Sequence, residues 1–239
     1  MRKTACIIIG IFITSSLFAE LSQSQKWAIA LTGIMTEINH DSFNTLNSSD
    51  LNESNREKYK VMLSRDWGIN TREELLSTIE KMENNGHAQE LILCQKIIND
   101  NENNKNDFSI YKMINTYNLT SKQYNYLKFT LLNWSIFQNK SILVWDLGRN
   151  IALCRWGYDS GFLTEQEAWD KIMYFAKIIQ PMYKSWEDYG FDYYMGRVFW
   201  ASGFGSDVDY LYSTDPIYRK LISDSGYWKN LEWNIDLSK

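Results

Sequence analysis

The chain has 239 residues, of which 44% are hydrophobic, 23% charged and 15% aromatic, and its formal net charge at pH 7 is −4. This composition excludes a disordered, collagen-like or coiled-coil protein, because those classes lack the apolar and aromatic side chains that build a core. A mean hydropathy of −0.40, with a long apolar run only at the N-terminus, excludes a multi-pass membrane protein. The acidic charge and the lack of a basic stripe argue against binding to nucleic acid, because that binding is driven by basic side chains that neutralise the phosphates.

The first 19 residues have the three parts of a secretory signal peptide. Arg2 and Lys3 form a positive start, residues 6–14 (CIIIGIFIT) form the apolar segment, and Ala19 is the expected last residue before cleavage. The apolar stretch is shorter than the about 20 residues that span a bilayer. We therefore expect an exported protein, periplasmic or extracellular, that keeps no stable membrane span after cleavage.

Apolar residues recur at three- and four-residue spacing, which predicts an all-α protein with a compact domain of about eight helices. The sequence has only two prolines, so long stretches lack the strongest helix breaker. In chain order, the expected helices cover residues 23–38, 56–67, 71–85, 88–98, 121–138, 141–160, 164–181 and 185–201.

Several of these ends carry local signals. Thr71 with Glu74, and Thr164 with Glu167, have the spacing of capping boxes. Asp215 before Pro216 is typical of a helix cap followed by proline in the first turn and predicts a further helix. The tail from residue 227 is either a strand or a packed segment.

The polar composition of two stretches predicts the organisation of the chain. Residues 39–55 are rich in Asn, Ser and Asp and should be a solvated loop, and residues 99–107 (NDNENNKND) are either a linker or a surface insert. We expect a signal peptide over 1–19, a helix and polar loop over 20–55, and a helical domain over 56–239.

The familiar catalytic and metal-binding motifs are absent. His40 and His87 are the only histidines, and no zinc-ligand spacing, nucleophile elbow or P-loop occurs, so we expect no metal and no cofactor. Carboxylate chemistry stays open, because acids are plentiful and their spacing alone is uninformative. Cys94 and Cys154 lie in apolar helical stretches, which favours small buried hydrophobes and leaves a disulfide open.

The densest set of candidate residues lies between 145 and 200. Helical geometry puts Arg149 on one stripe with Trp145 and Trp156. A guanidinium there needs a carboxylate, backbone carbonyls or an aromatic face as its partner. The same Gly-Arg pair, which is Gly148-Arg149 in the first helix, recurs as Gly196-Arg197 in the second.

Two interpretations give this cluster a role, and a third is that it only decorates the surface. In the first, Arg149 pairs with Glu187 or Asp188 and locks the packing of the helices. In the second, Arg149 and Arg197 line a cleft that binds an anionic group, where Asp146 or Glu187 acts as acid or base and His87 assists. A local capping or core role is the alternative for His87. Trp186 lies on the same face of its predicted helix as Arg197.

Two further features surround this cluster. Arg155 and Asp159, four residues apart on a less apolar side, are expected to form an ordinary surface pair. The region 183–200 contains eight aromatic residues, which cannot all be buried on one face of a helix. Some of them should therefore meet a second element, a partner or a ligand.

Three ordered blocks resemble the bacterial proteins catalogued as domain of unknown function 1266. They are DWGINTREELLSTIEKMENNGHAQE at 66–90, WDLGRNIALCRWGYDSGFLTEQEAWDKI at 145–172 and SWEDYGFDYYMGRVFW at 185–200. The resemblance implies a shared pattern that includes Trp67, Gly68, Gly86, His87, Asp146, Gly148, Arg149, Gly157, Gly161, Glu167, Ala168, Trp186, Glu187, Gly196 and Arg197. It implies no activity, because none is established for the family. The apparent signal peptide departs from most members, which look cytoplasmic.

The first functional hypothesis is a non-enzymatic, exported helical protein that binds a protein partner or serves as an accessory module. It is motivated by the excess of aromatic residues and the lack of a catalytic signature. The alternative is an enzyme or small-ligand receptor with an arginine-lined, anion-binding cleft. A third, blander hypothesis is a purely structural domain.

Overall fold

The computed structural model describes residues 20–48, 50–102 and 110–238, and all the regular structure in them is helical. The all-α prediction is therefore confirmed. The expected signal peptide and most of the polar run at 99–107 lie outside the described residues. No described helix is long and apolar enough to cross a membrane.

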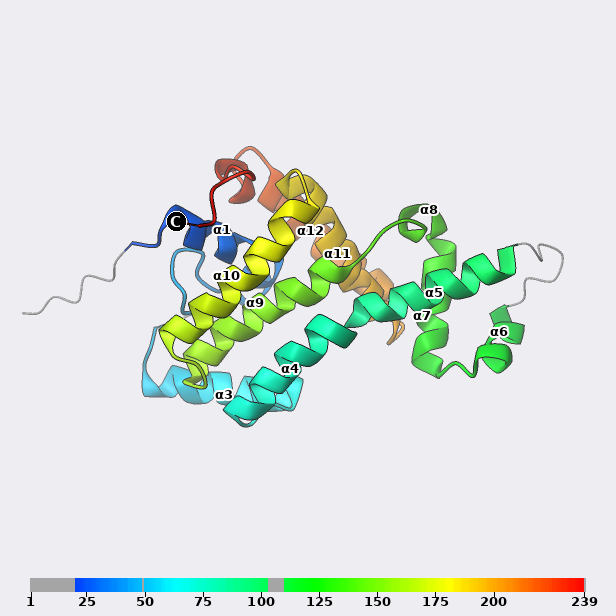
Figure 1. The fold of residues 1–239 in the computed structure, drawn as a ribbon, viewed down its shortest axis with the longest axis horizontal. Helices are drawn as coiled ribbons and strands as arrows, with labels where there is room; N and C mark the ends of the chain where they lie inside the picture. The colour runs from blue at the N-terminus through cyan, green and yellow to red at the C-terminus, as the bar shows by residue number, and fades with distance from the viewer. Residues whose placement is uncertain (1–19, 49, 103–109, 239) are drawn as a thin grey trace, which may run out of the picture.

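Helix α9 (Leu143–Ser160) runs through the middle of the molecule and is buried along almost its whole length (Figure 1). Because α9 is covered on several sides, its polar side chains are buried too and must find partners inside the protein. The helices packed against it are α3 (Glu53–Trp67), α4 (Arg72–Asn85), α5 (His87–Glu102), α10 (Glu165–Ile179) and α11 (Trp186–Ser202).

Helix α11 is the second buried helix, and its aromatic residues face several elements rather than one. Phe199 stacks on Tyr126 of α7 (Ser121–Leu132), with ring centroids 4.5 Å apart. Tyr194 stacks on Tyr218 of α12 (Asp207–Ile222). The aromatic excess between 183 and 200 is thus largely absorbed by contacts with second elements of the same chain.

An aromatic cluster joins the two ends of the described chain. Trp186 at the start of α11 contacts Trp27 of α1 (Gln23–Ala30), with ring centroids 5.2 Å apart. It also contacts Trp228 and Trp233 of the C-terminal segment, which contains the short 3-10 helix η2 (Trp228–Asn230). The tail from residue 227 is therefore a packed segment and not a strand.

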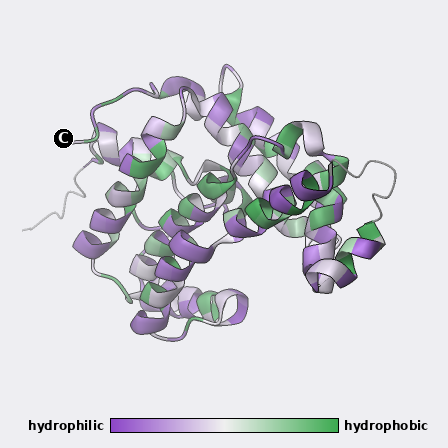
Figure 2. Ribbon diagram, turned by 45° about the vertical axis from the view of Figure 1, so that its right-hand side comes forward, coloured by the Kyte–Doolittle hydropathy of each residue, from purple (hydrophilic) through white to green (hydrophobic). Residues whose placement is uncertain are grey.

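A second group of helices extends to one side of α9 (Figure 1). Helices α5 and α7 pack against each other there, with α6 (Ile110–Tyr117) and α8 (Trp134–Phe137) nearby. Figure 2 shows hydrophobic and hydrophilic stretches alternating along the helices, as expected for amphipathic elements that share one core.

Local signals in the sequence predicted several helix ends correctly. Thr71 and Thr164 form the two expected capping boxes with the glutamates three residues later. Gly68 and Gly161 follow helices at φ of +66° and +80°, a backbone region that glycine adopts without steric cost.

The expected count of about eight helices is too low, because polar side chains split two predicted helices and because α6 has no counterpart among the predicted ones. Thr32 donates its hydroxyl to the carbonyl of Ile29 and separates α1 from α2 (Gly33–Asn39). Asn133 likewise donates to the carbonyl of Phe129 between α7 and α8. Such side chains compete with the backbone for helical hydrogen bonds.

The predicted helix start at Asp215-Pro216 is wrong. Helix α12 begins at Asp207 and continues through Pro216, which lies inside it. Acidic residues in the first turn, Asp207 and Asp209, complement the helix dipole at the true start. Tyr212, four residues before the proline, is exposed, so the carbonyl that loses its donor lies on the solvent side.

Candidate functional site

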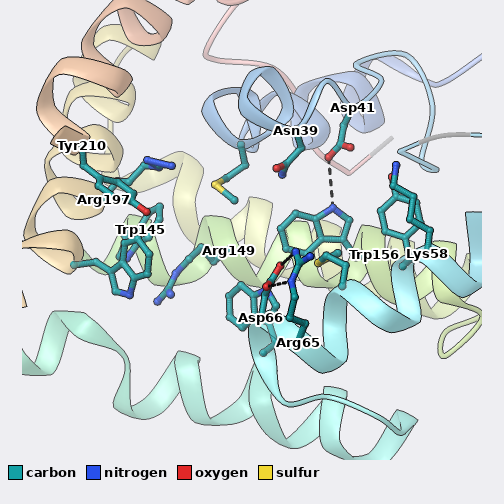
Figure 3. A pocket seen from close by; sticks show the side chains of 15 residues that line it. Asn39, Asp41, Lys58, Arg65, Asp66, Trp145, Arg149, Trp156, Arg197 and Tyr210 are labelled. Carbon is teal, nitrogen blue, oxygen red and sulfur yellow. Dashed lines mark hydrogen bonds and ion pairs between the residues drawn. The ribbon is translucent and has the colours of Figure 1, made fainter. Parts of the chain in front are cut away.

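A cavity of about 360 Å³ opens among α2, α3, α9, α11 and α12 (Figure 3). Both candidate arginines, Arg149 from α9 and Arg197 from α11, line it. Much of the remaining wall is aromatic, and these aromatic residues are Tyr59, Trp67, Trp145, Trp156, Trp200 and Tyr210. The cavity therefore combines cationic groups with flat apolar faces.

Two glycines bring the arginines to this common cavity. A Cβ on Gly148 would lie 2.4 Å from the ring of Tyr193, and a Cβ on Gly196 would lie 2.5 Å from Cβ of Trp145. Such distances are shorter than real carbon contacts, so α9 and α11 can cross this closely only because both positions lack a side chain. The repeated Gly-Arg pair thus marks the crossing point of the two helices.

Arg149 is a buried cation whose terminal Nη2 has partners on one side, whereas its Nε has no hydrogen-bond partner. Its Nη2 donates to Oδ1 of Asp146 over 2.7 Å and lies 2.9 Å from Nδ1 of His87. Its Cζ lies 4.5 Å from the ring centroid of Trp145 and 5.6 Å from that of Trp67. The guanidinium is therefore fixed by a carboxylate behind it and by aromatic faces beside it.

Asp146 and His87 form the support behind Arg149. Burial acts to raise the pKa of Asp146, but His87, Arg149 and the backbone N–H of Ala88 outweigh it and hold that pKa below its usual value. Burial lowers the pKa of His87, so the imidazole is neutral at pH 7. Nδ1 of His87 lies between Nη2 of Arg149 and, at 3.4 Å, Oδ1 of Asp146, so the tautomer of the ring decides whether Nδ1 accepts from the guanidinium or donates to the carboxylate.

Arg197 differs from Arg149 because no carboxylate faces it. Its Nη1 donates to Oγ1 of Thr214 over 3.2 Å, and its Cζ lies 4.5 Å from the ring centroid of Tyr210. Its Nε is buried without a hydrogen-bond partner, and no acidic group of the described residues lies within ion-pair distance. Burial lowers the pKa of this guanidinium.

The structure separates the predicted site residues into two groups. Trp145, Arg149, Trp156 and Arg197 line the cavity, and Asp146 and His87 lie directly behind Arg149. The other three predicted residues lie at the far end of α11: Trp186 in the aromatic cluster, and Glu187 and Asp188 at exposed positions. The expected pairing of Arg149 with Glu187 or Asp188 is therefore wrong, because the carboxylate that pairs with Arg149 is that of Asp146.

The expectation of a surface pair at Arg155 and Asp159 is also wrong. Both side chains are buried, at 1% and 2% exposure. Arg155 donates to the hydroxyls of Thr32 and Thr36 and to the carbonyls of Ser42, Thr45 and Leu46. Asp159 accepts from the backbone N–H of Ser48. Together they fasten the irregular segment 41–48 to α9.

That segment and the helices beside it supply the wall of the cavity that sequence analysis did not find. Met35 and Asn39 of α2, Asp41, and Lys58 of α3 all line it. Trp156 donates its indole Nε1 to Asp41 over 3.4 Å (Figure 3). The sequence carried no signal for this wall, because a polar, asparagine-rich stretch is typical of a solvated loop.

The two cysteines of the described chain are free and buried. Burial raises the pKa of Cys94 and of Cys154 to about 12, so neither thiol is reactive at neutral pH. No group of three or more His, Cys, Asp or Glu side chains among the described residues is placed to hold a metal ion.

The fold and the cavity define an all-helical protein with an arginine-containing, aromatic-walled cavity at the crossing of two buried helices. Residues 62–233 match the family described as "Protein of unknown function (DUF1266)", and the chain belongs to that family. This confirms the resemblance seen in the three sequence blocks.

Two relatives from Escherichia coli (strain K12) are similar to the chain. "Uncharacterized protein YbeR" is 26% identical over 184 residues, which cover 72% of this chain and 75% of the relative. "Uncharacterized protein YbeU" is 26% identical over 158 residues, which cover 66% of this chain and 64% of that relative. No solved structure matches the chain significantly.

Proposed function

We propose that the cavity is the binding site for a small organic anion and that the protein acts as a ligand-binding protein. The observation that carries this proposal is Arg197, a partly buried guanidinium in the cavity wall with no acidic partner among the described residues. A cation that is partly removed from water and has no counter-ion is costly, and a bound anion would complete its interactions.

The surroundings of Arg149 favour binding over chemistry. Asp146 is held in its ionised form behind Arg149, and Nδ1 of His87 contacts the same guanidinium. Glu187, the other candidate acid or base, lies in a different hollow near Trp228 and Trp233. Asp146 and His87 therefore position an arginine, and Glu187 lies outside the cavity.

The proposal is tested by titration of the full chain with 8-anilinonaphthalene-1-sulfonate, a fluorescent aromatic anion. We expect saturable binding that Arg197→Gln weakens at least tenfold. The matched control is Arg219→Gln, because Arg219 is an exposed arginine paired with Asp215 on the surface of α12. Equal affinities for the wild type, Arg197→Gln and Arg219→Gln would contradict an anion site at Arg197.

A second candidate function, binding of a protein partner, is favoured by a different surface. Phe204, Val208 and Tyr212 expose 61%, 57% and 75% of their surface around the start of α12. Neighbouring exposed apolar side chains of this size are typical of interaction sites. Cross-linking in the cell envelope followed by purification tests it, and a partner that is retained by the double variant Val208→Ser, Tyr212→Ser would argue against this surface.

The proposed export of the protein rests on its first 19 residues alone. Determination of the N-terminus of the protein purified from its own cells tests it. A mature chain that starts at or near Glu20 in the periplasm or medium is expected, whereas an intact Met1 in the cytoplasm would contradict export.

A further inference from the structure

The cavity also indicates the chemical class of its ligand. We infer that it takes a planar aromatic monocarboxylate, with the carboxylate against Arg197 and the ring system among the tryptophans. This inference rests on the proposed function and narrows it from organic anions in general to one class.

The balance of charges around the cavity favours a ligand with a single negative charge. Arg65 is paired with Asp66 over 2.6 Å, and Arg149 with Asp146 over 2.7 Å. Asp41 is electrostatically stabilised by Arg155 and Lys58, although burial raises its pKa.

Once the Arg65–Asp66 and Arg149–Asp146 pairs are set aside, the described lining residues carry the positive charges of Arg197 and Lys58 against the negative charge of Asp41, which leaves a net excess of one positive charge. A carboxylate carries one charge and balances it. A phosphate monoester carries about −1.5 to −2 at pH 7 and would leave excess negative charge close to Asp41 and Asp66.

The geometry of Arg197 favours a flat, two-oxygen acceptor. Its Nη1 is used by Thr214, and its ring-facing side lies over Tyr210. Nε has no hydrogen-bond partner but is enclosed by protein atoms, so the N–H groups left for a ligand are those of Nη2 and the second N–H of Nη1. Two parallel N–H groups on one edge of a guanidinium match the two oxygens of a carboxylate, which is the geometry of bidentate recognition.

The rest of the wall favours an aromatic body over an aliphatic chain. The ring centroids of Trp145 and Trp200 are 6.0 Å apart, and those of Trp67 and Trp156 are 6.3 Å apart. Flat rings bind one another by stacked and edge-on contacts that an alkyl chain cannot make. A volume of about 360 Å³ is near the lower end for ligand sites, which suits a molecule of one or two rings.

Calorimetric titration of the full chain with four probes tests the inference. The probes are indole-3-acetate, the neutral indole-3-ethanol, the dianionic 3-indoxyl phosphate and the aliphatic monoanion octanoate. We expect indole-3-acetate to bind at least tenfold more tightly than each of the other three. Arg197→Gln should remove this preference, and Arg197→Lys should recover only part of it because lysine lacks the planar fork.

Arg219→Gln again serves as the surface control, and circular dichroism shows whether each variant is folded. If indole-3-ethanol or octanoate bound as tightly as indole-3-acetate, the assignment of an aromatic carboxylate would be overturned. A preference for 3-indoxyl phosphate that still depends on Arg197 would overturn it too, but would leave the anion site intact. No binding of any probe, together with unchanged anilinonaphthalene sulfonate titration in Arg197→Gln, would refute both proposals.

Discussion

Removal of the carboxylate behind Arg149 tests the electrostatic basis of the cavity. Asp146 is fully buried, and the side chain of Arg149 is only 7% exposed. Asp146→Ala leaves this guanidinium and the N–H of Ala88 without their acceptor. Breaking a buried pair by removing one partner costs about 3–5 kcal/mol. For a chain of this size, that corresponds to a fall in Tm of roughly 6 °C or more.

Urea denaturation followed by tryptophan fluorescence measures this cost. The matched control is Asp215→Ala, which breaks the exposed pair with Arg219 and should cost about 0.3–0.5 kcal/mol. If both variants lose the same small amount, the reasoning about the buried pair is refuted.

The effect of Asp146 also has a defined pH dependence. Because its pKa is lowered in the fold, its contribution is complete above the unfolded-state pKa of about 3.9 and is lost as the pH falls through the folded-state pKa. The difference between the wild type and Asp146→Asn should therefore shrink as the pH falls below about 4.

Three other changes have expected outcomes. Burial raises the pKa of Asp159 to about 6, so the ionised form of this side chain opposes folding. In urea titrations, Asp159→Asn should therefore stabilise the protein by up to about 3 kcal/mol above pH 6 and should have no such effect below pH 4. Arg155→Leu leaves several buried acceptors without their hydrogen-bond donor, so limited proteolysis should cut within 41–48. Resistance to proteolysis equal to that of the wild type would refute this role of Arg155. Gly148→Ala should lower Tm, at a cost of about 1–3 kcal/mol, because its Cβ meets the ring of Tyr193; a rise in Tm would show that helix propensity dominates instead.

The sequence predicted those parts of the fold that depend on neighbouring residues. The capping boxes at Thr71 and Thr164 need only a hydroxyl and a glutamate three residues apart, so a local pattern is sufficient. The helix breaks at Thr32 and Asn133 are also local, but many serines, threonines and asparagines occur inside helices without breaking them. Such residues become breaks only where the surrounding packing accepts a bend.

The errors at Arg149 and Arg155 have different physical origins. A helical wheel assumes that one face is buried and the other solvated. Helix α9 is packed on several sides, so Arg155 on the less apolar side is as buried as the tryptophans. The partner of Arg149 was available three residues earlier in the same helix, at Asp146. The orientation of α11 determines that Glu187 and Asp188 point away, and no local pattern encodes that orientation.

The two walls of the cavity come from different parts of the chain. Trp67, Arg149 and Arg197 lie within residues 62–233, the part that matches the family. Met35 and Asp41 precede that part, and Arg155 of α9 donates to Thr36 beside Met35 and to the carbonyl of Ser42 beside Asp41. In the proposed function, recognition of the anion and of a ring therefore depends on the family-matched helices. The shape of the remaining space depends on an N-terminal segment that Arg155 and Asp159 attach to them, so a change in that segment should alter which ring fits without removing the requirement for a negative charge.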